Sequence, residues 1–315
     1  ADAVKFQTHV AADEQANLSV VSPHFRGAER YAWIARNERA TPPSFWKRVA
    51  EHASRRGILF FSTPMSRKAA EKLAVVDPPL WKVGSGDIHD FLLLDFLAST
   101  GKPIIISTGM ASFAELDRTV SFLRKRRARF AILYCVSKYP APPKSFNLAS
   151  LHDLRERYSG VPIGFSDHSV GGHSLPLAAV GLGARIIEKH FSLSRGLWGS
   201  DHKVSQTPRE FKELVSAIRR GEAEKVDPTP WYGARGRELA GARNEFRSFF
   251  FKTLVAARNL RAGATLRGAD MYAHRPARLL TGLPSHEAYR LIGRKTTRSI
   301  RRFEPLATDA LTPHV

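Results

Sequence analysis

Short apolar runs rich in β-branched residues alternate with helix-length segments over much of the chain. The intervening segments, such as Phe113–Lys125 and Phe146–Tyr158, place apolar residues at helical spacing with charged residues on the opposite face. The runs that we expect to form strands are Val4–Thr8, Ile58–Thr63, Leu80–Ser85, Pro103–Thr108, Phe130–Cys135, Val161–Asp167 and Arg185–Phe191. Repeated strand and helix units of this kind predict a parallel sheet that is buried on both faces.

The number of strands favours one α/β fold over another. A TIM barrel has one strand more than this chain supplies, and the chain begins directly in a strand. An open doubly wound sheet would carry a glycine-rich phosphate turn after its first strand, which Phe6-Gln-Thr-His9 is not. We therefore predict a TIM (β/α)8 barrel that lacks its first βα unit. Before the helix expected over Pro43–Arg56 comes a long polar connection that contains Asn17, Ser22, Pro23 and Gly27.

Composition divides the chain into two domains and a linker. Thr207, Pro208 and Glu210 carry the N-cap, first-turn and capping-box signals of a last barrel helix, so residues 1–220 form the predicted barrel. Residues 221–245 interleave glycine and proline with arginine and glutamate, as linkers do. Residues 246–315 show only short strand patterns, which predict a second, small domain. Those patterns are Lys252–Arg258, Ala269–His274 and Arg294–Ile300.

Charge and cysteine content narrow the class of protein. The 49 Lys and Arg against 29 Asp and Glu give a formal net charge of +20, but the basic residues are dispersed, which favours a solvated surface over nucleic-acid binding. No apolar run approaches the roughly 18 residues of a membrane span, and the start has no secretory signal pattern. The one cysteine, Cys135, cannot form an internal disulfide and is expected to be a buried strand thiol. We expect a cytoplasmic protein.

Polar residues gather where the predicted strands end. In a closed barrel these positions point into one mouth, where lysine supplies charge while hydroxyl and backbone N–H groups supply directed donors for an anion. Lys82 is the clearest case, because two glycines flank the serine of Lys82-Val-Gly-Ser-Gly-Asp87 directly after an apolar run. A lysine that merely extends to solvent from the barrel edge is the alternative. The other strand-end positions are Lys5, Gln7, Ser62, Thr63, Ser107, Thr108, Ser137, Tyr139, Ser166, Asp167, His168, Glu188 and His190.

Two histidines at neighbouring strand ends suit a divalent transition metal. A carboxylate precedes each of them within two residues, Asp167 before His168 and Glu188 before His190. A single histidine in such a place is more often a hydrogen-bonded core residue, and the loop residues His173 and His202 are competing ligands that spacing does not exclude.

These residues, taken together, resemble a known family. The segments Lys82–Asp87, Gly101–Met110, Tyr139-Pro140, Gly164–His168 and Glu188–Phe191 closely resemble the sialic acid (N-acetylneuraminate) synthase family, which includes legionaminic and pseudaminic acid synthases. The family condenses phosphoenolpyruvate with N-acetylmannosamine-type sugars. The resemblance runs from Val4 to the end of the chain, so the small domain is expected to be a SAF (antifreeze-like) domain.

The resemblance implies roles for particular residues. His168 and His190 resemble ligands of a divalent ion, Mn²⁺, Co²⁺ or Mg²⁺, with Glu188, Asp167 and Tyr139 as catalytic candidates. Tyr139, Asp201 and Arg275 resemble sugar contacts, Arg275 reaching the pocket of the other subunit in a domain-swapped homodimer. The contacts expected for phosphoenolpyruvate are Lys5, Lys82, Ser85, Ser107 and Ser166.

Departures from the family pattern fall mainly on the sugar side. Ser137 stands where relatives usually have Asn, Asp87 where Glu is common, and Ser200 where the family has Pro in Gly-Pro-Asp. Ala277–Leu280 replaces an expected glycine-rich turn. The prediction is a phosphoenolpyruvate-dependent synthase of a sialic-acid-like nonulosonic acid. The alternatives are another phosphoenolpyruvate-dependent aldol synthase, acting on a phosphorylated sugar, and a catalytically inactive binding module.

Overall fold

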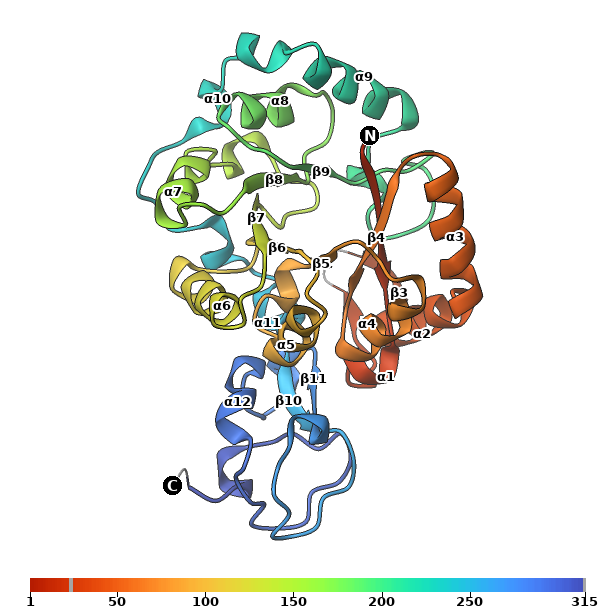
Figure 1. Cartoon of the computed structure of the whole chain (residues 1–315), viewed down its shortest axis with the longest axis vertical. Coiled ribbons are helices and arrows are strands. Elements are labelled where there is room, and N and C mark those ends of the chain that lie inside the picture. Colours follow the sequence, from red (N-terminus) through yellow and green to blue (C-terminus); the bar gives the residue numbers. More distant parts are fainter. Residues whose placement is uncertain (23–24, 314–315) are drawn as a thin grey trace.

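The seven predicted strands all form and run parallel in chain order. The computed structural model describes residues 1–22 and 25–313. One ladder pairs β1 (Ala3–Thr8) with β4 (Leu59–Pro64), and the other runs through the remaining five strands. These are β5 (Trp81–Val83), β6 (Ile104–Ser107), β7 (Phe130–Cys135), β8 (Ile163–Asp167) and β9 (Ile187–Lys189). The sheet curls, and helices surround its outer side (Figure 1).

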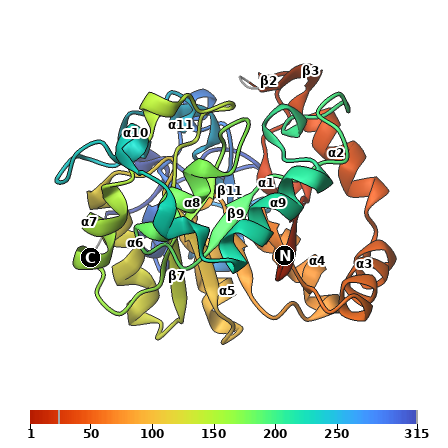
Figure 2. The same cartoon turned by 90° about the horizontal axis from the view of Figure 1, so that it is seen from above.

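The curled sheet is not a complete cylinder. Among the described residues no ladder of hydrogen bonds joins β9 to β1. Helix α9 (Pro208–Arg219) lies beside the N-terminal strand in both views (Figures 1 and 2), and Arg219 Nη2 contacts Asp2 Oδ1 at 2.5 Å. The predicted α/β class is confirmed in the coarser form of a curled parallel half-barrel.

The helices form where the sequence carries start and stop signals. Capping boxes begin α6 (Phe113–Lys125) at Ser112 and α9 at Thr207, as predicted for the latter, and Asp90 caps α5 (Phe91–Ser99). The other helices that cover the sheet are α3 (Pro43–Arg55), α4 (Arg67–Leu73), α7 (Ser150–Arg157) and α8 (Ser174–Gly181). Their apolar faces pack on strand residues such as Ile104, Ile132 and Phe165, each fully buried. Free Cys135 is buried in β7, as predicted.

The long polar connection after β1 contains more structure than predicted. It holds α1 (Ala11–Glu14), a hairpin of β2 (Val21–Ser22) and β3 (Phe25–Glu29), and α2 (Arg30–Ala40). The N-cap of α2 is Glu29, whose carboxylate accepts from the backbone N–H groups of Tyr31 and Ala32. Glutamate is not a usual N-cap residue, so the sequence lacked a start signal. Of the four residues named for this connection, Pro23 lies outside the described residues.

Residues 221–245 pack along the barrel rather than standing clear of it. They include α10 (Thr229–Tyr232), and Leu239 is buried in the main core. The backbone N–H of Leu148 donates to the Trp231 carbonyl at 2.9 Å, and Asn244 Nδ2 donates to the Ser137 carbonyl at 2.7 Å. The segment therefore ties the small domain to the strand ends.

The part of the chain after α11 (Arg247–Phe250) gathers a second hydrophobic cluster, which includes Leu254, Met271 and Ile300. It pairs β10 (Thr253–Ala256) antiparallel with β11 (Met271–His274) and ends beyond α12 (Ala288–Leu291). The predicted strand over Arg294–Ile300 appears only as isolated bridges, such as Leu260 to Ile300. In the described part of the chain no helix is long and apolar enough to cross a membrane.

Candidate active site

One pocket at the carboxyl ends of the strands gathers nearly all of the predicted site residues. Its lining includes Lys5, Lys82, Ser85, Ser107, Tyr139, Ser166, His168, Glu188, His190, Asp201 and Arg275. They come from β1, from β5 to β9 with the loops that follow these strands, and from the chain after β11. Curvature of the sheet, rather than nearness in sequence, brings them together.

Lys82 points into this pocket from β5. Its Nζ donates to Ser107 Oγ at 2.6 Å and to the Val83 carbonyl at 2.9 Å, and the side chain is 3% exposed. Burial lowers the pKa of Lys82, while the nearby Glu188 carboxylate opposes that shift. This is a lysine held inside the pocket, not one that extends to solvent.

Glu188 lies between two lysines at the base of the pocket. Its carboxylate is 3.7 Å from Lys5 Nζ and 4.0 Å from Lys82 Nζ, and it accepts a hydrogen bond of 2.9 Å from Ser166 Oγ. Burial alone would raise the pKa of Glu188, but the two lysines outweigh it and lower the pKa to about 2. The group is therefore an anion at neutral pH that holds both ammonium groups in place.

The turn after β6 brings backbone close to the serines. The N–H of Gly109 donates to Ser85 Oγ at 3.0 Å. A Cβ at position 109 would lie 2.1 Å from Ser137 Oγ and 2.9 Å from Ser85 Oγ, so any larger residue would displace these hydroxyl groups. The result is a cluster of small donors beside Lys82, suited to the oxygens of an anion.

The two histidines predicted as metal ligands face each other. Their ring centroids are 5.2 Å apart, and the Tyr139 ring lies 4.4 Å from His168 and 6.1 Å from His190. His168 Nδ1 is 2.9 Å from the Val136 carbonyl, and because a carbonyl only accepts, Nδ1 is the donor. His168 Nε2 then faces the pocket, 3.4 Å from the Tyr139 hydroxyl.

The donor set fits a divalent ion as two nitrogen ligands. The described residues hold no cluster of three His, Cys, Asp or Glu side chains placed for a metal. Burial lowers the pKa of His190 to about 4, which leaves that imidazole neutral and able to ligate. Burial would also lower the pKa of His168, but Cys135 and the Val136 carbonyl outweigh it and raise that pKa to about 9, so His168 must release a proton in order to ligate. Divalent ions commonly keep waters in their remaining positions. The rival His202 bonds to Ser192 Oγ at 2.7 Å, and neither it nor His173 lines the pocket.

The two aspartates of the predicted site lie in different surroundings. Asp201 lines the pocket, 3.9 Å from His190 Nδ1. Asp167 is fully buried outside the lining, where it pairs with Lys189 Nζ at 2.7 Å and accepts from the Ser169 N–H at 2.7 Å. Its contacts support the loop after β8.

Arg275 reaches the pocket from the small domain of its own chain. Its backbone N–H donates to the Glu14 carbonyl at 3.1 Å, and its guanidinium pairs with Asp87. Lys252 Nζ contacts the same Asp87 at 2.7 Å and Asp90 at 2.8 Å. In this single chain Arg275 lines the chain's own pocket. The contribution to the other subunit of a homodimer, which the resemblance implied, stays a prediction.

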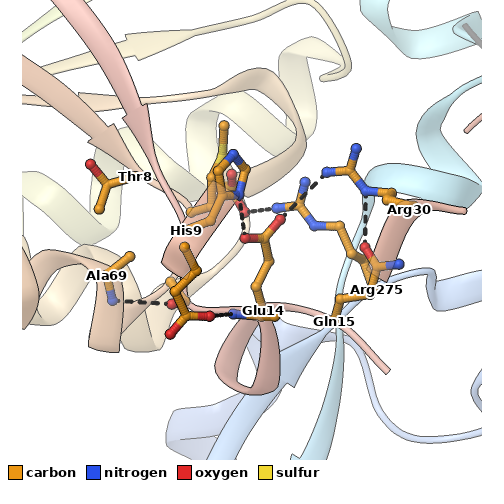
Figure 3. Close-up of polar contacts among 12 residues, drawn as sticks. Thr8, His9, Glu14, Gln15, Arg30, Ala69 and Arg275 are labelled. Atoms are coloured by element: carbon orange, nitrogen blue, oxygen red, sulfur yellow. Dashed lines mark hydrogen bonds and ion pairs between the residues drawn. The ribbon is translucent and has the colours of Figure 1, made fainter. Parts of the chain in front are cut away.

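Some lining residues were not predicted from the sequence. They are His9 after β1, Arg30 and Trp33 on α2, and Phe250 on α11. His9 Nδ1 contacts Glu14 at 2.7 Å, and Glu14 also pairs with Arg30 (Figure 3). Lys5, Gln7 and His9 stand two residues apart, so strand periodicity places them on one face, and this spacing was a signal for His9. Arg30 had none, because its helix was not predicted.

Comparisons with known proteins identify the class that this fold and site define. Residues 1–227 match the NeuB family, and the chain belongs to that family. It is 33% identical over 279 residues to N-acetylneuraminate-9-phosphate synthase of Drosophila melanogaster, covering 82% of this chain and 74% of that protein. It is 30% identical over 305 residues to pseudaminic acid synthase of Campylobacter jejuni, covering 96% and 85%.

A solved structure shows the same similarity. Spore coat polysaccharide biosynthesis protein SpsE of Bacillus subtilis superposes with a TM-score of 0.77 at 27% identity, covering 99% of this chain and 87% of that one. Two predictions are confirmed: the chain belongs to the sialic acid synthase family, and it is an enzyme of the acid-synthase kind.

Proposed function

We propose that this enzyme condenses phosphoenolpyruvate with an N-acylated, N-acetylmannosamine-type hexose to give a nonulosonic acid and phosphate. The observation that carries the proposal is that Lys5 and Lys82 share Glu188 in the pocket that holds two facing imidazoles. A small polyanion and an aldehyde could be held side by side there. The relatives named for N-acetylneuraminate 9-phosphate and pseudaminic acid support the same reaction class.

The lysine end of the pocket is the proposed phosphoenolpyruvate site. Lys5 and Lys82 supply positive charge, while hydroxyl groups supply directed donors. Those hydroxyls belong to Ser85, Ser107 and Ser166. The sugar is assigned to the opposite side, against Tyr139, Asp201 and Arg275.

The proposed reaction forms a C–C bond and a C–O bond to water, and it breaks the C–O bond to phosphate. C3 of phosphoenolpyruvate attacks the sugar aldehyde carbon, and the aldehyde oxygen takes up a proton. Water adds at C2 and gives up a proton, and the C2–O bond to phosphate then breaks, which leaves the keto group at C2. A divalent ion held by His168 and His190 would supply polarisation of the aldehyde oxygen. Glu188, held ionised by its lysine neighbours, is the catalytic candidate that positions Lys5 and Lys82 against phosphoenolpyruvate. Asp167, buried against Lys189, is assigned no step.

Phosphate release tests the proposal. The chain is supplied with phosphoenolpyruvate, Mn²⁺ and either N-acetylmannosamine or a diacetamido-hexose, and phosphate is measured with and without a chelator. We expect release only when sugar and metal are both present. Sugar-independent release, or none with any sugar, would contradict the proposal.

The organisation of the whole protein extends the proposal. We assign residues 1–220 to the synthase domain, 221–245 to the connecting segment and 246–315 to a SAF-like domain. A homodimer in the cytoplasm, using Mn²⁺, Co²⁺ or Mg²⁺, remains our prediction.

A further inference from the structure

Arg30 is a pocket residue that the proposed reaction has not used. It is the first residue of α2 and is 7% exposed. Glu29 fixes the start of that helix by accepting from two of its backbone N–H groups. The Arg30 guanidinium Nε donates to Gln15 Oε1 at 2.9 Å, and Nη2 lies 3.4 Å from Glu14 Oε1 (Figure 3). The side chain is therefore held rigidly at the pocket wall.

One edge of this guanidinium remains available to a ligand. Among the described residues Nη1 has no hydrogen-bond acceptor, while the side chain lines the pocket. Aromatic groups border the same place. The Phe250 ring centroid is 5.2 Å from Arg30 Cζ, and Trp33, one helical turn further along α2, also lines the pocket. The N–H groups of Arg30, beside the rings of Phe250 and Trp33, suit a ligand that offers an oxygen acceptor next to an apolar group.

Arg30 lies on the sugar side of the pocket rather than the lysine side. Its neighbour in the buried cluster is Arg275, and both guanidinium groups border Glu14 (Figure 3). Asp201, the other expected sugar contact, is among the charges that act on the Arg30 side chain. Lys5 and Lys82 are instead paired with Glu188.

Each buried cation described around Arg30 already has a carboxylate partner. Arg30 pairs with Glu14, Arg275 with Asp87, and Lys252 with Asp87 and Asp90, while Asp201 adds a further negative charge that acts on Arg30. A phosphate group would add uncompensated negative charge to this buried cluster, which is costly. A hydroxyl or an acylamino carbonyl oxygen would accept hydrogen bonds from Arg30 Nη1 and would add no charge.

We propose that Arg30 is a specificity-determining residue that donates hydrogen bonds to a neutral oxygen of the acceptor sugar and so selects an unphosphorylated sugar. This inference rests on the proposed function, and it names the class of sugar and the residue that recognises it. It concerns a residue of α2 that lies outside every motif by which the family was recognised.

Steady-state phosphate release separates this role from a structural one. The variants are Arg30→Gln, which removes the charge, and Arg30→Lys, which keeps the ion pair with Glu14 but loses the planar fork. We expect the sugar KM of Arg30→Gln to rise about 10- to 100-fold, the scale of one hydrogen bond to a charged group. The KM for phosphoenolpyruvate should stay within about twofold, and Arg30→Lys should fall between wild type and Arg30→Gln. Arg39→Gln, an exposed position on the same helix, is the matched control.

The acceptor class is tested on the wild type with N-acetylmannosamine and its 6-phosphate. We expect a higher kcat/KM for the neutral sugar. Preference for the 6-phosphate, an unchanged sugar KM in both variants, or a rise confined to the KM for phosphoenolpyruvate would overturn the inference while leaving the synthase reaction standing. Should wild type release no phosphate with these two sugars or with a diacetamido-hexose, the proposed function would fail, and this inference with it.

Discussion

At the scale of single residues, the turn after β6 shows how little room the pocket leaves. Alanine at position 109 would bring its Cβ within 2.1 Å of Ser137 Oγ and 2.8 Å of Cys135 Sγ. We predict that Gly109→Ala lowers the free energy of unfolding by about 1–3 kcal/mol, as overpacking does. It should also lower kcat/KM for phosphoenolpyruvate, because Ser85 must move. Denaturant unfolding and phosphate release measure the two effects.

A control and a partial rescue make this prediction specific. Gly268→Ala should be nearly neutral, since the nearest atom to its new Cβ is Ile292 Cδ1 at 3.9 Å. Adding Ser137→Gly to Gly109→Ala removes the closest contact and should recover part of the stability. A Gly109→Ala protein as stable and as active as wild type would show that the turn has room to adjust.

Local motifs predicted individual residues well only where the signal was dense. Lys82 stood out because two glycines and a serine follow it within a few positions, and it lies in the pocket beside Ser107. The sequence did not indicate that Arg30 lines the pocket, since it is one of many arginines and its position depends on contacts with Gln15 and Glu14. Contacts of that kind arise from tertiary folding, which periodicity does not encode.

At the scale of elements, α1, α2 and the end of β11 meet at Glu14. Burial would raise the pKa of Glu14, but His9, Arg275 and Arg30 outweigh it and lower the pKa to about 2, from an ordinary 4.5. Because the pKa of Glu14 is lower in the folded protein than in the unfolded chain, Glu14 stabilises the fold at pH values above its unfolded pKa. That stability is lost as the pH falls from about 4.5 to 2. We predict a loss of about 3 kcal/mol over this window, by the conversion of pKa shift to free energy.

Unfolding measured against pH checks this contribution. Glu14→Gln should be less stable than wild type at pH 7 and show a flatter decline below pH 4.5. Glu213→Gln, at an exposed position of α9, should follow the wild-type curve. Parallel curves for Glu14→Gln and wild type would indicate that Glu14 does not carry the pH dependence.

The type of an element, helix or strand, was easier to predict than its first and last residues, and one helix was not predicted at all. The bounds of α6 matched the prediction because a capping box begins it and basic residues end it. The strand over Arg185–Phe191 shortened to β9, Ile187–Lys189, at its C-terminal side because His190 turns into the pocket and Phe191 pairs with Gln206 instead. Helix α2 was missed because its cap is a glutamate and because its last six residues, Ala35–Ala40, include three charged ones and no large apolar one.

At the scale of the whole molecule, the sequence predicted the parallel strands but not how the small domain sits on them. Seven alternating runs were enough for the α/β class. The docking depends on pairs distant in sequence, such as Arg247 with Glu115 and Asn244 with the Ser137 carbonyl. A single chain without aligned relatives offers no pattern from which such pairs can be deduced.

Lys252 is the buried charge that joins the two domains. Its Nζ contacts Asp87 and Asp90 and donates to the Met65 carbonyl at 2.6 Å, and the side chain is 1% exposed. Burial would lower the pKa of Lys252, but the two carboxylates raise it, so the ammonium stays charged. Lys252→Met would leave the carboxylates buried with Arg275 as their remaining cation.

We predict that Lys252→Met lowers the free energy of unfolding by about 3–5 kcal/mol, the cost of breaking a buried ion pair from one side. Because Asp87 also holds Arg275, the sugar KM should rise as well. Lys295→Met, at an exposed position in the same domain, should change stability by less than about 0.5 kcal/mol. Adding Asp90→Asn to Lys252→Met removes one unpaired charge and should restore part of the loss. Equal stability of Lys252→Met and Lys295→Met in denaturant unfolding would mean that the apolar contacts of Phe249 and Phe250, rather than this charge cluster, hold the small domain on the barrel.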